Sequence, residues 1–251
     1  MAGTVGFAIV SVIMGRLADI SINNIFLVFG VVGLLTIISA FFLPKVAGHG
    51  AKTVKTDWGP LFKNKALLIV LALMFMIQLT MTFFNSYQSV YYKEQGLDLT
   101  VLGFSLLLQT ISEVPFMLFS HKLIKKFGAG VLMFFCSAVL MLRWFLLFLV
   151  KSTVPVLLLQ FMHGPSFVFA TVVMAMFMNE NMSPELKARG QIFISLTSSF
   201  SRVIGNLIGG FLIDAFGSTR PILLLFAILM AINIVVMFFL FKKVGGFKNK
   251  A

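Results

Sequence analysis

The chain has 251 residues, of which 59% are hydrophobic and only 11% are charged, and its mean hydropathy is +1.03. Soluble domains are far more polar, so this composition excludes a soluble protein and indicates an integral membrane protein. The net charge of +12 would suit a nucleic-acid ligand, but the basic residues lie between apolar runs, as topology signals do, and we expect no nucleic-acid partner.

Eight apolar segments follow one another along the chain, each long enough or nearly long enough to cross a bilayer. The sequence therefore predicts an all-α membrane protein with eight transmembrane helices in a lipid bilayer. Their expected ranges are about 3–18, 22–43, 66–92, 100–120, 128–150, 154–179, 190–213 and 222–241.

The first two segments are similar to the last two. Gly15 precedes Asp19 by four residues, and Gly210 precedes Asp214 by four; a short polar turn follows each aspartate, and then an apolar helix that ends in lysine. The long offset between the copies suits a parallel duplication of a six-helix unit. We thus expect a truncated chain that lacks four helices of a first half. Chance similarity of two glycine-rich hairpins and a paralogous eight-helix protein are the alternatives.

The longest polar connection, 45–65, carries five lysines and divides the chain. It predicts four regions: the last two helices of an N-terminal half (1–44), a cytoplasmic central loop (45–65), a C-terminal six-helix bundle (66–243) and a cytoplasmic tail (244–251). With this loop inside, 14 Lys and Arg residues fall on the inner side and four on the outer side. The positive-inside rule therefore predicts a multi-pass plasma-membrane protein with both termini cytoplasmic.

A polar stripe runs along segment 66–92. Its residues recur at the spacing of one helical face and are Gln78, Thr82, Asn85 and Ser89, with Tyr92 continuing the face. A water-filled cavity explains such a stripe best, and hydrogen bonding between helices is the alternative. Gln78, Asn85 and Gln88, with Gln109 on the next segment, are our candidates for substrate binding.

Segment 190–213 carries a second stripe of this kind. Its members are Ser195, Ser198, Ser199, Arg202 and Asn206. Gly205 and Gly209, four residues apart, form a small-xxx-small pair that we assign to close helix packing.

Segment 100–120 holds a carboxylate, Glu113, near its middle. A lone charge at the centre of a membrane helix costs about 2.5 kcal/mol or more, so Glu113 is expected to face the bundle interior or a wet cavity. Pro115 leaves a second polar group in need of a partner, because its ring removes the amide that would bond the backbone carbonyl one turn back. Glu113 is either a proton- or substrate-handling carboxylate or a neutral, hydrogen-bonded side chain in a kinked helix.

Arg143, His163 and Arg202 also fall within expected spans. A helix rise of ~1.5 Å per residue places Arg143 ~12 Å and His163 ~13 Å from the outer ends of their spans, and Glu113 ~20 Å down. We expect Glu113 to pair with Arg202 or Arg143, and protonation of Glu113 to break the pair. His163 precedes Gly164 and Pro165, hence a helix irregularity, and is either a switch near neutral pH or a plain hydrogen-bonding group.

The motifs FFNSYQSVYYKEQG (83–96), EVPF (113–116), RW (143–144), LLQFMHGPSFVFA (158–170) and RGQ (189–191) occur in this order. Together they resemble the major facilitator superfamily, and most closely its proton-coupled branch of lactose-permease-like, phenylpropionate-permease-like and nucleoside-symporter-like proteins. The resemblance implies that the chain covers helices five to twelve of twelve: the C-terminal six-helix half of a major facilitator fold plus the last two helices of the N-terminal half.

The resemblance also implies secondary transport of a small solute, with proton symport as the expected mode. Glu113, Arg143, His163 and Arg202 are then candidates for proton coupling or substrate binding. In the lactose-permease arrangement a carboxylate follows the histidine by one turn, whereas this chain has Ser166 there, so a substrate role is as well supported as a coupling role. The amides suit sugars or nucleosides, and the arginines suit carboxylates.

A membrane-embedded binding or assembly module that does not transport is the competing hypothesis. The expected partners are a small-molecule substrate, a proton and the bilayer, with the missing N-terminal helices or a second copy of the chain as protein partners. We expect no cofactor, no metal site and no enzymatic activity. Cys136 stands alone in an apolar run, and the sequence contains no GxxxxGKS/T phosphate loop and no nucleophile elbow.

Overall fold

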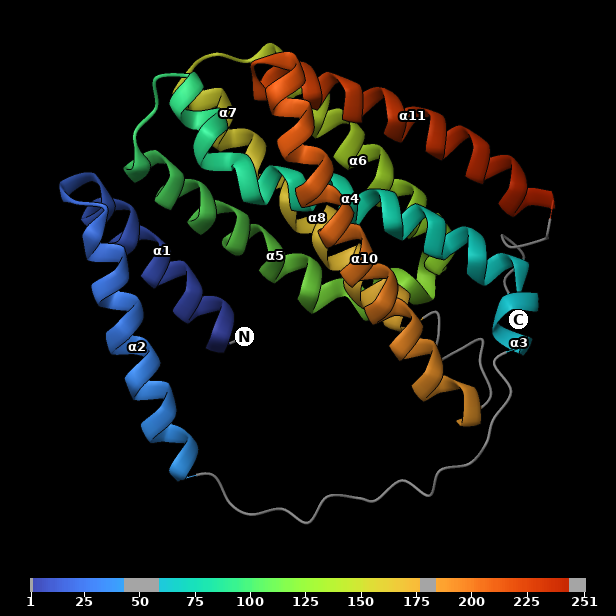
Figure 1. Cartoon of the computed structure of the whole chain (residues 1–251). Coiled ribbons are helices and arrows are strands. Elements are labelled where there is room, and N and C mark those ends of the chain that lie inside the picture. Colours follow the sequence, from blue (N-terminus) through green and yellow to red (C-terminus); the bar gives the residue numbers. More distant parts are fainter. Residues whose placement is uncertain (1, 43–58, 177–183, 244–251) are drawn as a thin grey trace.

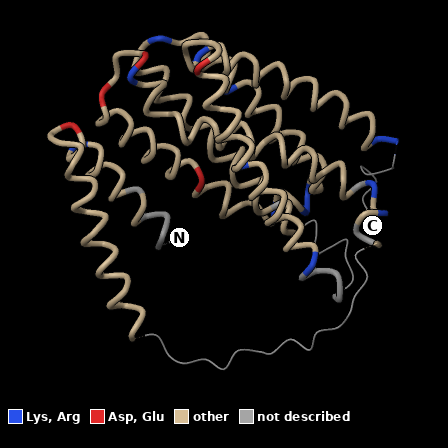
Figure 2. The backbone as a smooth tube through the Cα atoms, viewed as in Figure 1, with Lys and Arg blue, Asp and Glu red and all other residues tan. Residues whose placement is uncertain are grey.

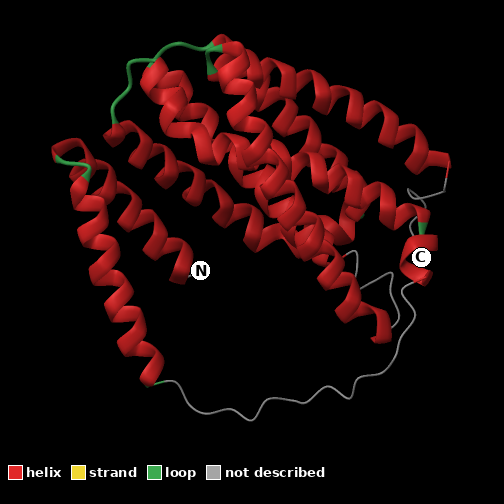
Figure 3. Ribbon diagram, in the orientation of Figure 1, coloured by secondary structure: helices red, strands yellow, loops and turns green. Residues whose placement is uncertain are grey.

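The computed structural model describes residues 2–42, 59–176 and 184–243. Within these ranges every regular element is helical (Figure 3). The elements are α1 (Ala2–Ile20), α2 (Asn23–Phe41), α3 (Gly59–Lys63), α4 (Lys65–Glu94), α5 (Leu99–Phe127), α6 (Ala129–Leu149), α7 (Thr153–Leu159), the 3-10 turn η1 (Gln160–Met162), α8 (His163–Val168), the π-helical turn η2 (Phe169–Val173), α10 (Pro184–Phe216) and α11 (Thr219–Lys243).

The predicted all-α membrane architecture is confirmed. Among the described residues, seven helical stretches are long and apolar enough to cross a membrane. They comprise α2, α4, α5, α6, the composite of α7, η1, α8 and η2, then α10 and α11. The remaining long helix, α1, has 19 residues and packs along α5. Each expected segment therefore corresponds to a helix. Most of the central loop, the end of the sixth segment and the tail lie outside the described residues.

Side-chain and glycine caps set several helix ends. The Asn64 side chain accepts a hydrogen bond from the Leu67 amide at 3.0 Å and starts α4, and Asp98 accepts one from the Val101 amide at 2.9 Å and starts α5. Such caps satisfy amides that have no partner inside the helix. Gly128 has φ of +78°, a left-handed conformation that favours glycine, and it separates α5 from α6.

The helix α4 lies at the centre of the bundle. It packs against α6, α10 and α11 (Figure 1), and 72% of its apolar span is buried. By contrast, none of the described side chains of α2 is buried. Figure 2 shows that charged residues gather at the ends of the helices, with Asp and Glu mainly at the end where α4 finishes and α11 begins. Large apolar side chains cover much of the surface between the two ends, as a bilayer requires.

The α1 helix attaches to α5 through a close crossing. A Cβ added to Gly15 would lie 2.8 Å from the Leu99 carbonyl oxygen and 3.0 Å from the Gly103 Cα, so only glycine permits this approach. One turn later, Asp19 accepts hydrogen bonds from the backbone amides of Leu99 (2.9 Å) and Thr100 (2.8 Å) and from the Thr100 hydroxyl. The Gly15–Asp19 pair therefore holds α1 against α5: the glycine permits the close approach of the two helices, and the carboxylate caps the N-terminus of α5.

The sixth apolar segment is irregular where the sequence predicts it. The chain leaves α-helical geometry at η1, immediately before His163, and again at η2, Phe169–Val173. Such breaks in the regular ladder aim side chains differently from a continuous helix and are frequent at functional positions.

Candidate functional site

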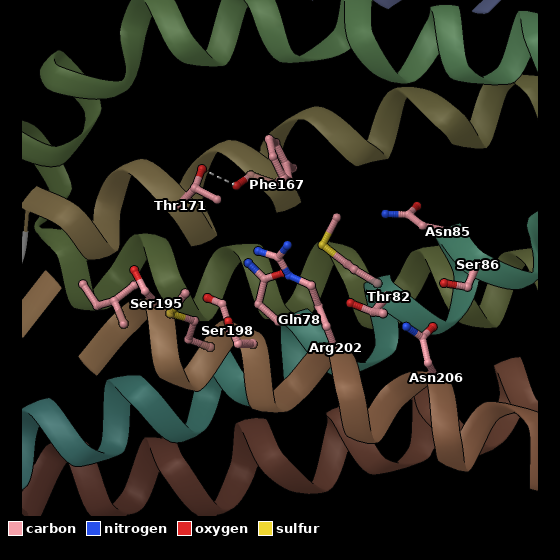
Figure 4. A pocket seen from close by; sticks show the side chains of 14 residues that line it. Gln78, Thr82, Asn85, Ser86, Phe167, Thr171, Ser195, Ser198, Arg202 and Asn206 are labelled. Carbon is pink, nitrogen blue, oxygen red and sulfur yellow. Dashed lines mark hydrogen bonds between the residues drawn. The ribbon is translucent and has the colours of Figure 1, made fainter. Parts of the chain in front are cut away.

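A cavity of about 620 Å³ lies between α4, α10 and the α8–η2 segment. Most of its polar side chains belong to the two stripes predicted from the sequence: Gln78, Thr82 and Asn85 on α4, and Ser195, Ser198, Ser199, Arg202 and Asn206 on α10 (Figure 4). Ser86 on α4 and Thr171 on η2 also line it and were not predicted, whereas Ser89 and Tyr92 of the predicted α4 stripe do not. Its apolar side chains are Met74, Met81, Phe167 and Ile194. A cavity of this volume suits a small-molecule ligand.

The glycines of α10 bring the two cavity walls together. A Cβ on Gly205 would lie 2.8 Å from the Leu79 carbonyl oxygen, and one on Gly209 would meet the Phe83 and Tyr87 rings at 2.7 and 2.6 Å. Their assignment to packing is therefore confirmed. The Tyr87 hydroxyl also donates to the Asn206 carbonyl at 3.0 Å, which ties α4 to α10 at one end of the cavity.

Arg202 is the ionisable residue of this cavity. Its exposed side chain lines the cavity and extends from α10 beside Gln78 (Figure 4). Phe167 lies on the opposite side of the cavity (Figure 4). The lining contains no carboxylate. Within the described part of the chain, no hydrogen bond or ion pair engages the guanidinium.

A second polar cluster is buried on the other side of Phe167. His163 Nε2 lies 3.4 Å from Glu113 Oε1, and His163 Nδ1 lies 3.2 Å from Arg143 Nη1. Because a guanidinium nitrogen only donates, Nδ1 must accept in this contact and carries no proton. The imidazole is then neutral and carries its single N–H on Nε2, the nitrogen that lies 3.4 Å from Glu113 Oε1.

Arg143 is fully buried and is held by acceptors and rings. Its Nη2 donates to Gln160 Oε1 at 2.6 Å, and the same oxygen accepts from Gln109 Nε2 at 2.7 Å. The guanidinium carbon lies 5.2 Å from the Phe84 ring centroid and 5.1 Å from that of Trp144. Aromatic faces attract a desolvated cation, so these contacts compensate in part for burial of the charge.

A close crossing of α5 and α8 positions this cluster. The Gly164 amide donates to Ser112 Oγ at 2.8 Å, and a Cβ on Gly164 would overlap the Ser112 backbone carbonyl. Each of these residues is adjacent in sequence to one partner of the Glu113–His163 contact. The glycine therefore sets the distance between the carboxyl group and the imidazole.

The partner of Glu113 differs from the expectation. Glu113 contacts His163, and Arg143 contacts the other ring nitrogen of His163. Arg202 lies in the cavity instead. Arg143 and His163 do meet, as their equal depths predicted, but Glu113 meets them too despite its greater estimated depth. A residue count gives a position along one helix, but the ends of different helices lie at different heights, so such counts do not give a common depth (Figure 1). The long side chains of Glu113 and Arg143 also span part of the distance that separates the helices at this point.

The glutamine candidates fall in three different environments. Gln78 lines the cavity with Asn85. Gln109 belongs to the buried Arg143 cluster, and Gln88 is buried elsewhere, where it donates to the Tyr92 hydroxyl at 3.0 Å. Tyr92 in turn donates to Ser105 Oγ at 2.6 Å, so the far end of the predicted α4 stripe makes contacts between helices and does not line the cavity.

Sequence reasoning missed Gln160, which joins Arg143 to Gln109, and Phe167, which separates the two clusters. Gln160 precedes His163 by three residues and so lies on the same helical face, a spacing that identifies it in retrospect. Nothing in the sequence distinguishes Phe167 from the other phenylalanines of the chain, which has 30 in all, so its position between the two clusters was not predictable. In the described residues, no group of three or more His, Cys, Asp or Glu side chains is arranged to hold a metal ion.

The helical architecture agrees with a family match along most of the chain. The model of the family described as "MFS_1 like family" matches residues 1–224. The chain belongs to this family. Its resemblance to the major facilitator superfamily is thereby confirmed at the level of the superfamily.

A curated relative of this MFS_1 like chain comes from Bacillus subtilis (strain 168) and is named "Uncharacterized transporter YwbF". The two sequences are 24% identical over 233 residues, which make up 90% of this chain and 57% of the relative. The chain thus spans somewhat more than half the length of the curated relative that it matches.

Proposed function

We propose that this MFS_1 like chain belongs to a secondary carrier that moves a small solute together with a proton. The cavity is the solute site, and the cluster of Glu113, His163 and Arg143 is the proton site. The contact between Arg143 Nη1 and His163 Nδ1 beside Glu113 carries the proposal, because a proton added at either acid–base residue disturbs it. The proposal includes the lactose-permease-like branch and a plasma-membrane location with both termini cytoplasmic.

A proton on His163 acts by repulsion. The protonated imidazole has N–H groups on both nitrogens, so Nδ1 turns from acceptor to donor while Arg143 Nη1 lies 3.2 Å away. Two donors and two positive charges then face each other inside the bundle, where such charges are poorly screened. Arg143 must move away from the ring.

A proton on Glu113 acts by removing the balancing negative charge. With Glu113 ionised and His163 neutral, one negative and one positive charge are separated by a single imidazole ring. Protonation of Glu113 leaves Arg143 as the uncompensated charge of the cluster. A buried cation without a counter-charge is costly, so the state of Glu113 biases the position of Arg143.

Two aromatic side chains connect the proton site to the cavity. Phe167 stacks on the His163 ring at 5.4 Å between centroids, with an interplanar angle of 14°, and also lines the cavity. Phe84 lies against the Arg143 guanidinium and precedes the cavity residue Asn85 on α4. Movement of Arg143 or His163 therefore shifts a wall that the solute touches, which is the coupling that symport requires.

Uptake into proteoliposomes tests this proposal. The protein is reconstituted as this chain or as part of a longer chain that contains it, and labelled sugars, nucleosides and carboxylates are supplied with an imposed pH gradient. We expect accumulation of one solute class that follows the pH gradient. Glu113→Gln should abolish accumulation but retain exchange of solute across the membrane, because the solute site is intact.

Asp214→Asn is the matched control, since this carboxylate is exposed near the end of α10 and lies outside both clusters. Its accumulation should equal that of the wild type. Unchanged pH-driven accumulation by the Glu113→Gln variant would refute the coupling. Solute binding without flux in every form would favour the non-transporting binding module instead.

A further inference from the structure

We infer that the ligand of the cavity is a hydroxylated organic anion with one carboxylate, of the sugar-acid type, whose carboxylate is bound by Arg202. This inference rests on the proposed role of the cavity as the solute site. It follows from the charge of the lining, from the positions of the acids that the structure describes, and from the polar groups that surround the guanidinium.

The cavity carries a fixed positive charge without a fixed negative one. The guanidinium group of Arg202 is cationic, and the other residues of the lining are uncharged. A cationic ligand would be repelled, and a neutral one would leave the guanidinium uncompensated at membrane depth. Charges held inside membrane proteins are paired as a rule, so an anionic ligand is the occupant that this lining favours.

The acids whose side chains the structure describes do not supply the counter-charge. Asp19 and Asp98 cap α5, Glu94 accepts from Ser218 and Thr219 at the start of α11, and Glu113 contacts His163. Asp214 lies on the same helix as Arg202, but twelve residues further along the chain, which is ~18 Å at the rise of an α-helix. None of these side chains pairs with Arg202, so a ligand in the cavity is a source from which a counter-charge can reach it.

The surroundings of Arg202 favour a carboxylate attached to a polar body. A guanidinium binds a carboxylate through two parallel hydrogen bonds. Ser198 and Ser199, one turn before Arg202 on α10, also line the cavity, as do the amides of Gln78 and Asn85 on α4. In the described part of the chain, no hydrogen bond engages these four side chains, so their donors and acceptors remain available to hydroxyl groups of a ligand.

Binding of D-gluconate by the purified protein in nanodiscs tests the inference, with D-glucitol as the matched neutral molecule. Glucitol differs from gluconate by a CH₂OH group in place of the carboxylate, so the pair isolates the charge. We expect labelled gluconate to bind and excess gluconate to displace it at least 10-fold more effectively than glucitol. Arg202→Gln should weaken gluconate binding at least 10-fold, and Arg202→Lys should retain part of it.

Arg16→Gln is the control, because Arg16 is exposed near the end of α1 and lies outside the cavity. Gluconate binding by this variant should equal that of the wild type. Equal displacement by glucitol and gluconate, absence of gluconate binding, or full binding by Arg202→Gln would overturn the inference. Tighter binding of 3-phenylpropionate than of gluconate would overturn the hydroxylated body of the ligand.

The assay contains no pH gradient and measures no flux, so it separates this inference from the proposed function. A protein that binds gluconate through Arg202 but fails to accumulate it under a pH gradient supports the anion site and contradicts symport. A protein that accumulates a neutral solute under a pH gradient and ignores gluconate contradicts the anion site alone.

Discussion

At the scale of single residues, the buried cluster depends on one acceptor atom. Gln160 Oε1 receives hydrogen bonds from both Arg143 Nη2 and Gln109 Nε2, while Gln160 Nε2 donates to the Val156 carbonyl at 2.8 Å. One glutamine thereby satisfies a buried cation, an amide and a backbone carbonyl. Its loss is felt most by the cation, because an unsatisfied charged donor costs more than a neutral one.

Gln160→Leu should therefore lower the free energy of unfolding by about 3 kcal/mol, the cost of a buried charged donor that loses its acceptor. Gln109→Leu is the matched substitution, because it removes a neutral donor and leaves Arg143 bonded to Gln160. We expect it to cost about 1 kcal/mol. Thermal unfolding in detergent compares the two variants. Equal losses would contradict the view that Gln160 acts mainly on Arg143.

The sequence located the charged residues of the site but predicted only one of the two contacts between them. Equal depth predicted the meeting of Arg143 with His163, because both counts start from helix ends that lie close together. The contact of Glu113 with His163 was not predicted. It depends on how closely α5 approaches α8, and a sequence pattern does not encode that distance. Gly164 determines it, and in the sequence this residue indicated only an irregular helix.

At the scale of helices, the close crossing of α5 and α8 predicts the effect of replacing Gly164. Gly164→Ala places a methyl group against the Ser112 backbone carbonyl, so the two helices must separate and Glu113 must move away from His163. Overpacking of this kind costs about 1–3 kcal/mol. We expect lower thermal stability together with a loss of pH-driven uptake. Gly30→Ala on α2, where nothing lies within 4 Å of the added Cβ, should change neither.

The junction of α1 and α5 predicts a pH-dependent stability. Hydrogen bonds from the Thr100 hydroxyl and from the Leu99 and Thr100 amides hold the pKa of Asp19, near the end of α1, below its usual value of 3.8. A carboxyl group with a lowered pKa in the folded state stabilises the fold above its unfolded pKa, and that stabilisation disappears as the pH falls through the folded pKa.

Asp19→Asn should therefore lower the melting temperature at pH 7, and its difference from the wild type should shrink as the pH falls below about 4 and vanish once the pH is below the lowered pKa of the folded state. Melting curves across this range measure the effect. Asp214→Asn, the equivalent position of the repeated hairpin, is the comparison. Since no hydrogen bond engages the Asp214 side chain in the described part of the chain, its curves should follow the wild type throughout. A persistent difference for Asp19→Asn at low pH would exclude the carboxylate as the cause.

At the scale of the whole molecule, composition and periodicity were sufficient for the fold. Eight apolar runs predicted eight helices, and the stripes on α4 and α10 predicted which faces enclose a cavity. The separation of the charges into two sites was not predictable. It arises because Phe167 stands between Arg202 and the Glu113 cluster, and nothing in its local sequence marks it as a wall. The proposed solute site and the proposed proton site are therefore neighbours without direct contact.

The orientation of the bundle yields the last prediction. The Arg220 side chain donates to the Phe148 and Leu149 carbonyls, so the end of α6 and the start of α11 lie on the same side of the membrane. From Arg220, α11 continues to Lys242 for 22 residues, or ~33 Å at the helical rise, which exceeds the hydrocarbon thickness of ~30 Å. Residues near Lys151 and near Lys242 must therefore face opposite compartments.

A membrane-impermeant maleimide applied to intact cells tests which compartment each end faces. Lys151→Cys should be labelled directly, and Lys242→Cys only after the membrane is permeabilised, because the excess of Lys and Arg on the Lys242 side predicts a cytoplasmic location. The native Cys136 is fully buried and donates to the Ser166 carbonyl at 2.9 Å, so the wild-type chain should remain unlabelled in both conditions. Labelling of Lys242→Cys in intact cells, with Lys151→Cys protected, would contradict the predicted topology, and the proposed direction of transport would then be reversed.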